Sequence, residues 1–273
     1  MGQATDLAPL LPAATAASQG IREALMAGDL ARVTVLVDNL PETDRDLWRG
    51  ILAIVRNDST AAIRALRRMG HPKALGVAYY LARQHVLFRE QMAEAIRKTP
   101  HDFGPYYYLG RHYDSDVDNA EEAAKWFRLA LERNSGYTRA RFYLGNCLER
   151  TGQLAEAEAE YMASLTVAQS LVGLARLRLG EGNAAAALEF VKKAMEMDSR
   201  DAAAPKLAAR IYGALDRPRD SIRAMETAAV LAPRDATVRY QLWRTYQAAG
   251  EAAKAAAALS EFERLRAIYG MKP

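Results

Sequence analysis

The stretch that decides the fold is FYLGNCLERTGQLAEAEAEYMASL, residues 142–165. Apolar and small side chains recur at helical spacing on both sides of Gly152, which predicts two short helices joined by a tight turn. Small residues such as Gly145 and Ala157 fall where two packed helices would come close together, and Tyr161 is large enough to fill the space between them. The stretch therefore predicts a helical hairpin.

The same pattern returns along the chain. In each copy of the pattern, one position in the first helix is normally occupied by a small residue. This position is at 110, 145, 175, 209 and 243, which gives intervals of 35, 30, 34 and 34 residues. Residues 103–269 are thus predicted to form five regular hairpins. Shorter and more degenerate versions occupy residues 15–102, and residues 1–14 are interpreted as an N-terminal tail. The chain as a whole predicts about eight hairpins, or about 16 helices.

The turns between paired helices follow a steric rule. Such a turn needs one residue near the left-handed region of φ and ψ, which Gly adopts without cost and Asn or Asp adopt next most easily. The hairpin near Arg83 offers no such residue. The other turns are predicted at Gly28, Asn57, Asp118, Gly152, Gly182, Asp216 and Gly250.

The repeat resembles the tetratricopeptide repeat, a helix-turn-helix unit of 34 residues. The resemblance is best over residues 103–269, where Pro233 ends a second helix as the proline of that family does. It departs from the family at Trp243, where a small residue is expected, and at Ser135 and Ser199, which replace the terminal proline. The resemblance implies an all-α, right-handed superhelical α-solenoid, continuous along the chain, with first helices lining its concave face.

The resemblance also implies that the concave face holds a peptide or a helix of a partner. The predicted partner-binding groove consists of Tyr107, Arg111, Phe142, Asn146, Arg176, Lys206, Arg210, Tyr240 and Arg244. Only one of its arginines, Arg111, has an acid three or four residues away on its own helix, namely Asp114.

These arginines have two interpretations. In the first, they are solvated or pair with acids of adjacent helices. In the second, they bind an acidic or carboxylate-terminated segment, with Tyr107, Phe142 and Tyr240 as apolar anchors. The carboxylate clamp of chaperone-binding members of the family is not reproduced, because Phe142 stands where the clamp lysine would be.

The function predicted from the resemblance is that of a non-enzymatic scaffold that binds a partner protein or peptide and needs no cofactor. Two alternatives remain open, a helical-repeat protein that binds single-stranded RNA and a self-assembling structural scaffold. The net charge of +4 and the pI near 9.1 allow RNA, but charges of both signs are interspersed and form no basic arm. Repeat lengths from about 26 to 35 residues also spoil a code of one base per repeat. The oligomeric state stays open.

Other motifs carry no predicted chemistry. GEGNAA, residues 180–185, matches a dinucleotide-binding fingerprint but follows a predicted helix and not a strand. The histidines, at positions 71, 85, 101 and 112, form no H-x-x-x-H pair, and none of them is expected to have a nearby Cys or carboxylate at metal-ligand spacing. The lone cysteine, Cys147, is interpreted as a small buried residue. No metal site is therefore predicted.

The acidic run YDSDVDNAEEA, residues 113–123, begins like a calcium loop. A calcium loop that starts at Asp114 would need a bidentate Glu at position 125, where this chain has Lys125. The run is therefore predicted to be an enlarged hairpin turn, with Asp118 at the turn and Asn119 opening the next helix.

The sequence contains no run of about 18 apolar residues, so no membrane span is predicted. The sequence as written predicts a cytoplasmic protein, or a periplasmic or exported one if an N-terminal signal has been trimmed.

Overall fold

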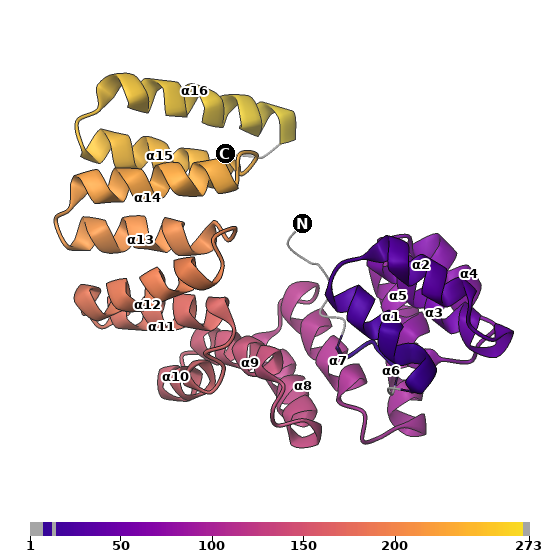
Figure 1. Ribbon diagram of the computed structural model, residues 1–273. Helices are drawn as coiled ribbons and strands as arrows, with labels where there is room; N and C mark the ends of the chain where they lie inside the picture. Colours follow the sequence, from indigo (N-terminus) through magenta and orange to yellow (C-terminus); the bar gives the residue numbers. More distant parts are fainter. Residues whose placement is uncertain (1–7, 13–14, 270–273) are drawn as a thin grey trace. The chain divides into compact units, whose positions relative to one another are not determined.

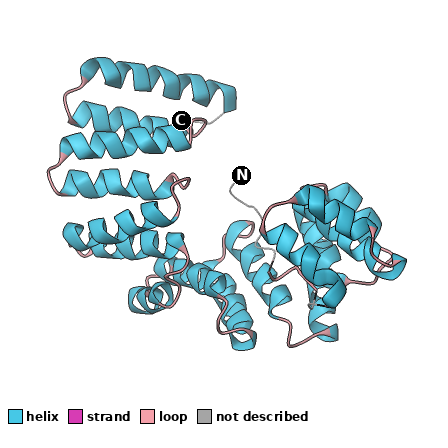
Figure 2. Ribbon diagram, in the orientation of Figure 1, coloured by secondary structure: helices cyan, strands magenta, loops and turns pink. Residues whose placement is uncertain are grey.

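The computed structural model describes residues 8–12 and 15–269, without the side chains at positions 16, 17 and 43. Within these residues every regular element is a helix, as Figures 1 and 2 show, which confirms the predicted all-α class. The helices of the described residues are α1 (Ala16–Met26), α2 (Leu30–Asp38), α3 (Glu42–Val55), α4 (Ser59–Leu66), α5 (Pro72–Leu81), α6 (His85–Lys98), α7 (Phe103–Ser115), α8 (Ala120–Arg133), α9 (Thr138–Arg150), α10 (Leu154–Met162), α11 (Ala168–Gly180), α12 (Ala184–Met197), α13 (Ala203–Ala214), α14 (Pro218–Leu231), α15 (Ala236–Ala248) and α16 (Ala252–Tyr269).

The helices pair in chain order into hairpins, and the pairing agrees with the predicted count of about eight. Contacts divide the chain into two compact units, residues 1–140 and 141–273. The first unit contains α1 to α8, and the second contains most of α9 and all of α10 to α16. The boundary that the sequence places between residues 102 and 103 separates degenerate from regular repeats and stays a prediction.

Part of the predicted N-terminal tail is packed. Leu10 and Leu11 are buried in the apolar core of the first unit. The guanidinium of Arg22 donates a hydrogen bond to the carbonyl oxygen of Pro12. Residues 8–12 therefore belong to the first unit, and the interpretation of residues 1–14 as a tail is wrong for them. The rest of that range lies outside the described residues.

The turns follow the predicted steric rule. All seven predicted turn residues have φ between +52° and +79°. The turn that lacked a suitable residue uses Arg83 itself, with φ at +58°. A non-glycine side chain in this region costs free energy, and Arg lacks the short polar side chain that makes it easier for Asn and Asp.

The residue after several of these turns caps the second helix. Asp29, Asp58, Asn119 and Asn183 each follow a left-handed residue, and each side chain accepts a hydrogen bond from the backbone N–H three residues later. The run YDSDVDNAEEA follows this rule, because α7 ends at Ser115, Asp118 is left-handed and Asn119 caps α8. Its interpretation as a hairpin turn is confirmed.

Two neighbouring glycines allow a direct test of the turn rule. Gly182 has φ at +79°, whereas Gly180 is the last residue of α11 and a Cβ there would meet nothing within 4 Å. We expect Gly182→Ala to lower the free energy of unfolding by about 1 kcal/mol, because Ala enters the left-handed region only at a cost. Gly180→Ala should instead raise it by about 0.5 kcal/mol, since Ala has the higher helix propensity. Urea denaturation of both variants checks the two signs, and equal effects would contradict the rule.

Among the described residues, no helix combines the length and the apolar character that crossing a bilayer requires.

Candidate functional site

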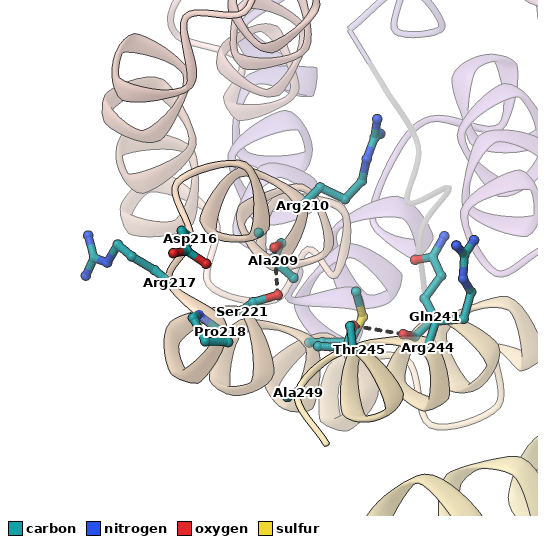
Figure 3. A pocket seen from close by; sticks show the side chains of 13 residues that line it. Ala209, Arg210, Asp216, Arg217, Pro218, Ser221, Gln241, Arg244, Thr245 and Ala249 are labelled. Atoms are coloured by element: carbon teal, nitrogen blue, oxygen red, sulfur yellow. Dashed lines mark hydrogen bonds between the residues drawn. The ribbon is translucent and has the colours of Figure 1, made fainter. Parts of the chain in front are cut away.

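The second unit contains a crevice of about 520 Å³ where α13, α14 and α15 meet. We call it the α13–α15 crevice, and Figure 3 shows its lining side chains. Small residues of α13 and α15, such as Ala209, Gly213 and Ala248, form part of its walls and leave space that larger side chains would fill. The lining residues are Ala209, Arg210, Gly213, Asp216, Arg217, Pro218, Ser221, Met225, Gln241, Arg244, Thr245, Ala248 and Ala249.

Two of the predicted groove residues, Arg210 and Arg244, line this crevice from α13 and α15. Both side chains are exposed, and neither forms an ion pair or a hydrogen bond with any residue that the structure describes. They therefore present guanidinium donors that are available to a ligand. Asp216 and Arg217 lie at the other end of the crevice in Figure 3. Arg217 is engaged there, because it pairs with Asp220 at 2.6 Å.

The crevice also contains an acceptor without a partner. The Oε1 atom of Gln241 is buried and accepts no hydrogen bond from the described residues. The hydroxyl groups nearby are already used, since Ser221 donates to the carbonyl oxygen of Ala209 and Thr245 to that of Gln241, as the dashed lines in Figure 3 show. Buried polar atoms normally have hydrogen-bond partners, so a ligand or water that donates a hydrogen bond would satisfy the Oε1 atom of Gln241.

Arg176 behaves differently from Arg210 and Arg244. Its guanidinium donates two parallel hydrogen bonds to Glu149, from Nε to Oε1 at 2.9 Å and from Nη2 to Oε2 at 2.7 Å. It also contacts Asn146 Oδ1 at 3.1 Å. For Arg176 the structure therefore realises the first interpretation of the arginines, in which they pair with acids of adjacent helices.

Burial would raise the pKa of Glu149, but hydrogen bonds from Arg176 and Tyr161 hold it below its ordinary value. Asn146 belongs to the same network, because its Oδ1 accepts a hydrogen bond from Arg176 and lies 3.2 Å from the Tyr161 hydroxyl oxygen. Arg176 and Asn146 are therefore committed to internal contacts in the second unit.

The remaining groove residues of the second unit are partly accessible. Tyr240 is exposed, and its ring packs on Trp243 at 5.2 Å and on Phe262 at 5.3 Å between centroids. Lys206 is half-buried one turn before Arg210 on α13. Phe142 is half-buried, with its ring 6.4 Å from that of Tyr161.

The two groove residues of the first unit do not form such a surface. Tyr107 is fully buried, with its ring edge-on to that of Tyr137. Its assignment as an anchor in a groove is therefore corrected: the ring is part of the core. Arg111 is half-buried, with Nη1 3.5 Å from the Tyr107 hydroxyl. The predicted groove residues, chosen by repeat position alone, therefore include residues with internal contacts as well as accessible ones. Of the whole set, only Arg210 and Arg244 line the crevice.

Sequence reasoning missed Gln241. It lies three residues before Arg244, so helical spacing places both on one face of α15. That spacing was the available signal, but nothing in the sequence indicates that its amide oxygen would be buried without a partner.

Comparisons with known proteins identify the fold. No protein-family model matches the sequence, and no curated protein sequence matches it. Among solved structures, a chain of the APC/C hetero-tetramer Cut9-Hcn1 is similar with a TM-score of 0.71 and 13% identity, over 90% of this chain and 52% of that one. MamA 41-end from Desulfovibrio magneticus RS-1 is similar with a TM-score of 0.50 and 16% identity, over 60% of this chain and 94% of that one.

These neighbours are tetratricopeptide-repeat proteins. The fold of this chain is therefore the tetratricopeptide-repeat fold, as the sequence predicted. The chain spans about half the length of the Cut9-Hcn1 chain that it matches.

Proposed function

We propose that this protein is a protein-interaction scaffold that binds an acidic peptide segment of a partner at the α13–α15 crevice. The observation that supports this most is the pair of exposed arginines, Arg210 and Arg244, which line the crevice without an internal partner. Other arginines of the second unit, such as Arg176 and Arg178, already pair with glutamates. The crevice is thus a place where this unit leaves guanidinium groups uncommitted.

The donors and acceptors of the crevice suit a peptide. A guanidinium group binds a carboxylate through two parallel hydrogen bonds, which favours Asp, Glu or a C-terminal carboxylate in the ligand. Gln241 Oε1 needs a donor, and the backbone N–H of a peptide is one. The exposed ring of Tyr240, one helical turn before Arg244, adds apolar surface for a neighbouring side chain.

In this role the protein acts by binding, without chemistry on its partner. The tetratricopeptide-repeat fold agrees with such a role, since repeat proteins present extended surfaces for partners. A fold by itself does not determine function, so the proposal rests on the two arginines and Gln241.

The test uses selected peptides as probes. A random peptide-display library is selected on the full chain, and the enriched peptides are synthesised with a fluorescent label for anisotropy measurements. We expect them to share Asp or Glu. We also expect the double variant Arg210→Glu, Arg244→Glu to bind them at least about tenfold more weakly, because a tenfold change corresponds to about 1.4 kcal/mol, which the loss of a charged hydrogen bond supplies.

A matched control carries the same change of charge outside the crevice. Arg219 and Arg234 are exposed residues of the second unit that do not line it. The variant Arg219→Glu, Arg234→Glu should keep wild-type affinity. Equal losses in both double variants would indicate general electrostatic attraction and contradict the proposed site. Tighter binding of a single-stranded oligouridylate, with a steep dependence on salt, would favour the RNA alternative instead.

A further inference from the structure

Three potential metal ligands meet in the first unit, where the start of α6 lies beside the end of α7. They are His85 on α6, His112 on α7 and Asp116, the residue that caps the end of α7. One ligand atom from each lies within 4.8 Å of the others. The imidazole rings are stacked with centroids 5.1 Å apart, and His112 Nδ1 is 3.5 Å from Asp116 Oδ2.

Four polar atoms of this cluster lack hydrogen-bond partners among the described residues. His112 is 1% exposed, and both of its ring nitrogens are buried without a partner among the described residues. His85 Nδ1 and Asp116 Oδ2 are buried without partners as well. A neutral imidazole has one donor and one acceptor, so either orientation of His112 leaves both unsatisfied. Several such atoms in one place call for a group that completes them, such as an ion or water.

Arg83 holds Asp116 in position without occupying the oxygen that faces the histidines. The guanidinium of Arg83 donates to Asp116 Oδ1 at 2.7 Å. Oδ2 stays directed at the cluster, 3.5 Å from His112. Arg83 is also the turn residue with φ at +58°, in place of the Gly, Asn or Asp of the other hairpins. It therefore acts as a positioning residue for the carboxylate.

We propose that His85, His112 and Asp116 bind a single divalent transition-metal ion, for which Zn²⁺ is the best-suited candidate. Two imidazole nitrogens and one carboxylate oxygen are a donor set that zinc accepts, with water in the remaining position. Mg²⁺ and Ca²⁺ prefer oxygen ligands and fit this set poorly.

Binding requires a small local closure. Zinc holds nitrogen and oxygen ligands at about 2.0–2.2 Å, so the ligand atoms must approach one another more closely than the 4.8 Å limit within which they now lie. His85 can move most easily, because it is the first residue of α6 and only half-buried. The ion would join α6 to α7, and hence the third hairpin to the fourth. The site is therefore expected to stabilise the first unit.

The sequence contains the signal for this site, although it was not recognised. His112 and Asp116 are four residues apart, a spacing that places two ligands on one face of a helix. The expectation that no carboxylate stands at metal-ligand spacing from a histidine is thus wrong for His112. His85 comes from another helix, and only the fold brings it near the pair.

The experiment uses the full chain without a polyhistidine tag, treated first with a chelator. Titration with Zn²⁺ by calorimetry should show one site, and Co²⁺ should produce visible d–d absorption bands without a thiolate charge-transfer band. Saturating Zn²⁺ should raise Tm, because a ligand that binds only the folded state stabilises it. The variants His85→Ala and Asp116→Asn should each weaken Zn²⁺ binding at least 100-fold and abolish the cobalt bands.

The matched control removes the two other histidines of the chain, His71 and His101. The variant His71→Ala, His101→Ala should keep the stoichiometry and the spectrum. Circular dichroism checks that each variant folds, and His85→Ala is the decisive one because its side chain is the more accessible. The proposal is overturned if the folded wild type gives no cobalt bands and no rise in Tm. It is also overturned if His85→Ala binds Zn²⁺ as tightly as the wild type, in which case the cluster is aromatic packing only.

Discussion

Truncating Tyr161 to alanine is expected to lower the free energy of unfolding of the second unit by about 4 kcal/mol, the range for a buried aromatic side chain. The ring is fully buried. It lies between α9 and α11, in contact with both through glycines: a Cβ at Gly145 would come within 2.7 Å of the ring, and one at Gly173 within 2.5 Å. No smaller side chain can fill this space without a large backbone shift, so a cavity should remain.

Urea denaturation followed by circular dichroism measures this effect, and hydrogen exchange at the amides of residues 141–269 assigns it to the second unit. Tyr161→Phe is the matched control. It keeps the ring and removes only the hydroxyl that donates to Glu149 at 2.7 Å, so we expect a loss of about 1–2 kcal/mol. Gly173→Ala should destabilise by about 1–3 kcal/mol through overpacking. A loss below about 1 kcal/mol in Tyr161→Ala would show that Tyr161 is not the packing centre of these helices.

Removing the charge of Glu149 is expected to cost about 2 kcal/mol at neutral pH, the scale of a hydrogen-bonded charge pair that is partly exposed. Glu149→Gln keeps the shape of the side chain but breaks the paired hydrogen bonds with Arg176. Because the exposed fractions are 36% for Arg176 and 21% for Glu149, solvent screens part of the interaction. A double-mutant cycle with Arg176→Met isolates the coupling between the two side chains.

The effect of Glu149→Gln should depend on pH. The pKa of Glu149 is lowered in the folded protein because the hydrogen bonds from Arg176 and Tyr161 outweigh burial. A carboxylate with a lowered pKa adds stability above its unfolded pKa, and that stability is lost as pH falls through the folded pKa. The difference between wild type and Glu149→Gln should thus be full above about pH 5 and shrink in acid.

The control for this prediction is an exposed ion pair of the same unit. Glu189 is 69% exposed and lies 3.5 Å from Lys192. Glu189→Gln should change the free energy of unfolding by less than about 0.5 kcal/mol at any pH. If Glu149→Gln behaves like Glu189→Gln, the Arg176–Glu149 pair contributes no more than an ordinary surface pair does.

Much of the fold could be predicted because it depends on local rules. The hairpins follow from helical periodicity, and the seven turns from the few residue types that enter the left-handed region easily. Arg83 shows where local rules end. Nothing in its own side chain favours φ at +58°, and the structure shows instead a tertiary contact with Asp116, 33 residues away.

The candidate sites show the same division. Repeat position alone placed Arg176, Arg210 and Arg244 together, since each occupies the same place in its first helix. Glu149 distinguishes Arg176 from the other two. It lies on an adjacent helix, 27 residues from Arg176, and accepts hydrogen bonds from its guanidinium. No comparable acid reaches Arg210 or Arg244 among the described residues. The place of Tyr107 in its repeat assigned it to the predicted groove, but helix packing buries it in the core.

The sequence by itself determined the all-α class, the repeat and the turns, since each depends on residues within a few positions of one another. Tertiary structure alone decided which arginines remain free, that Gln241 Oε1 is buried without a partner, and that His85 lies beside His112 and Asp116. The physical reason is that pairing and burial depend on side chains that separate helices bring together, and the spacing of residues along one helix does not record them.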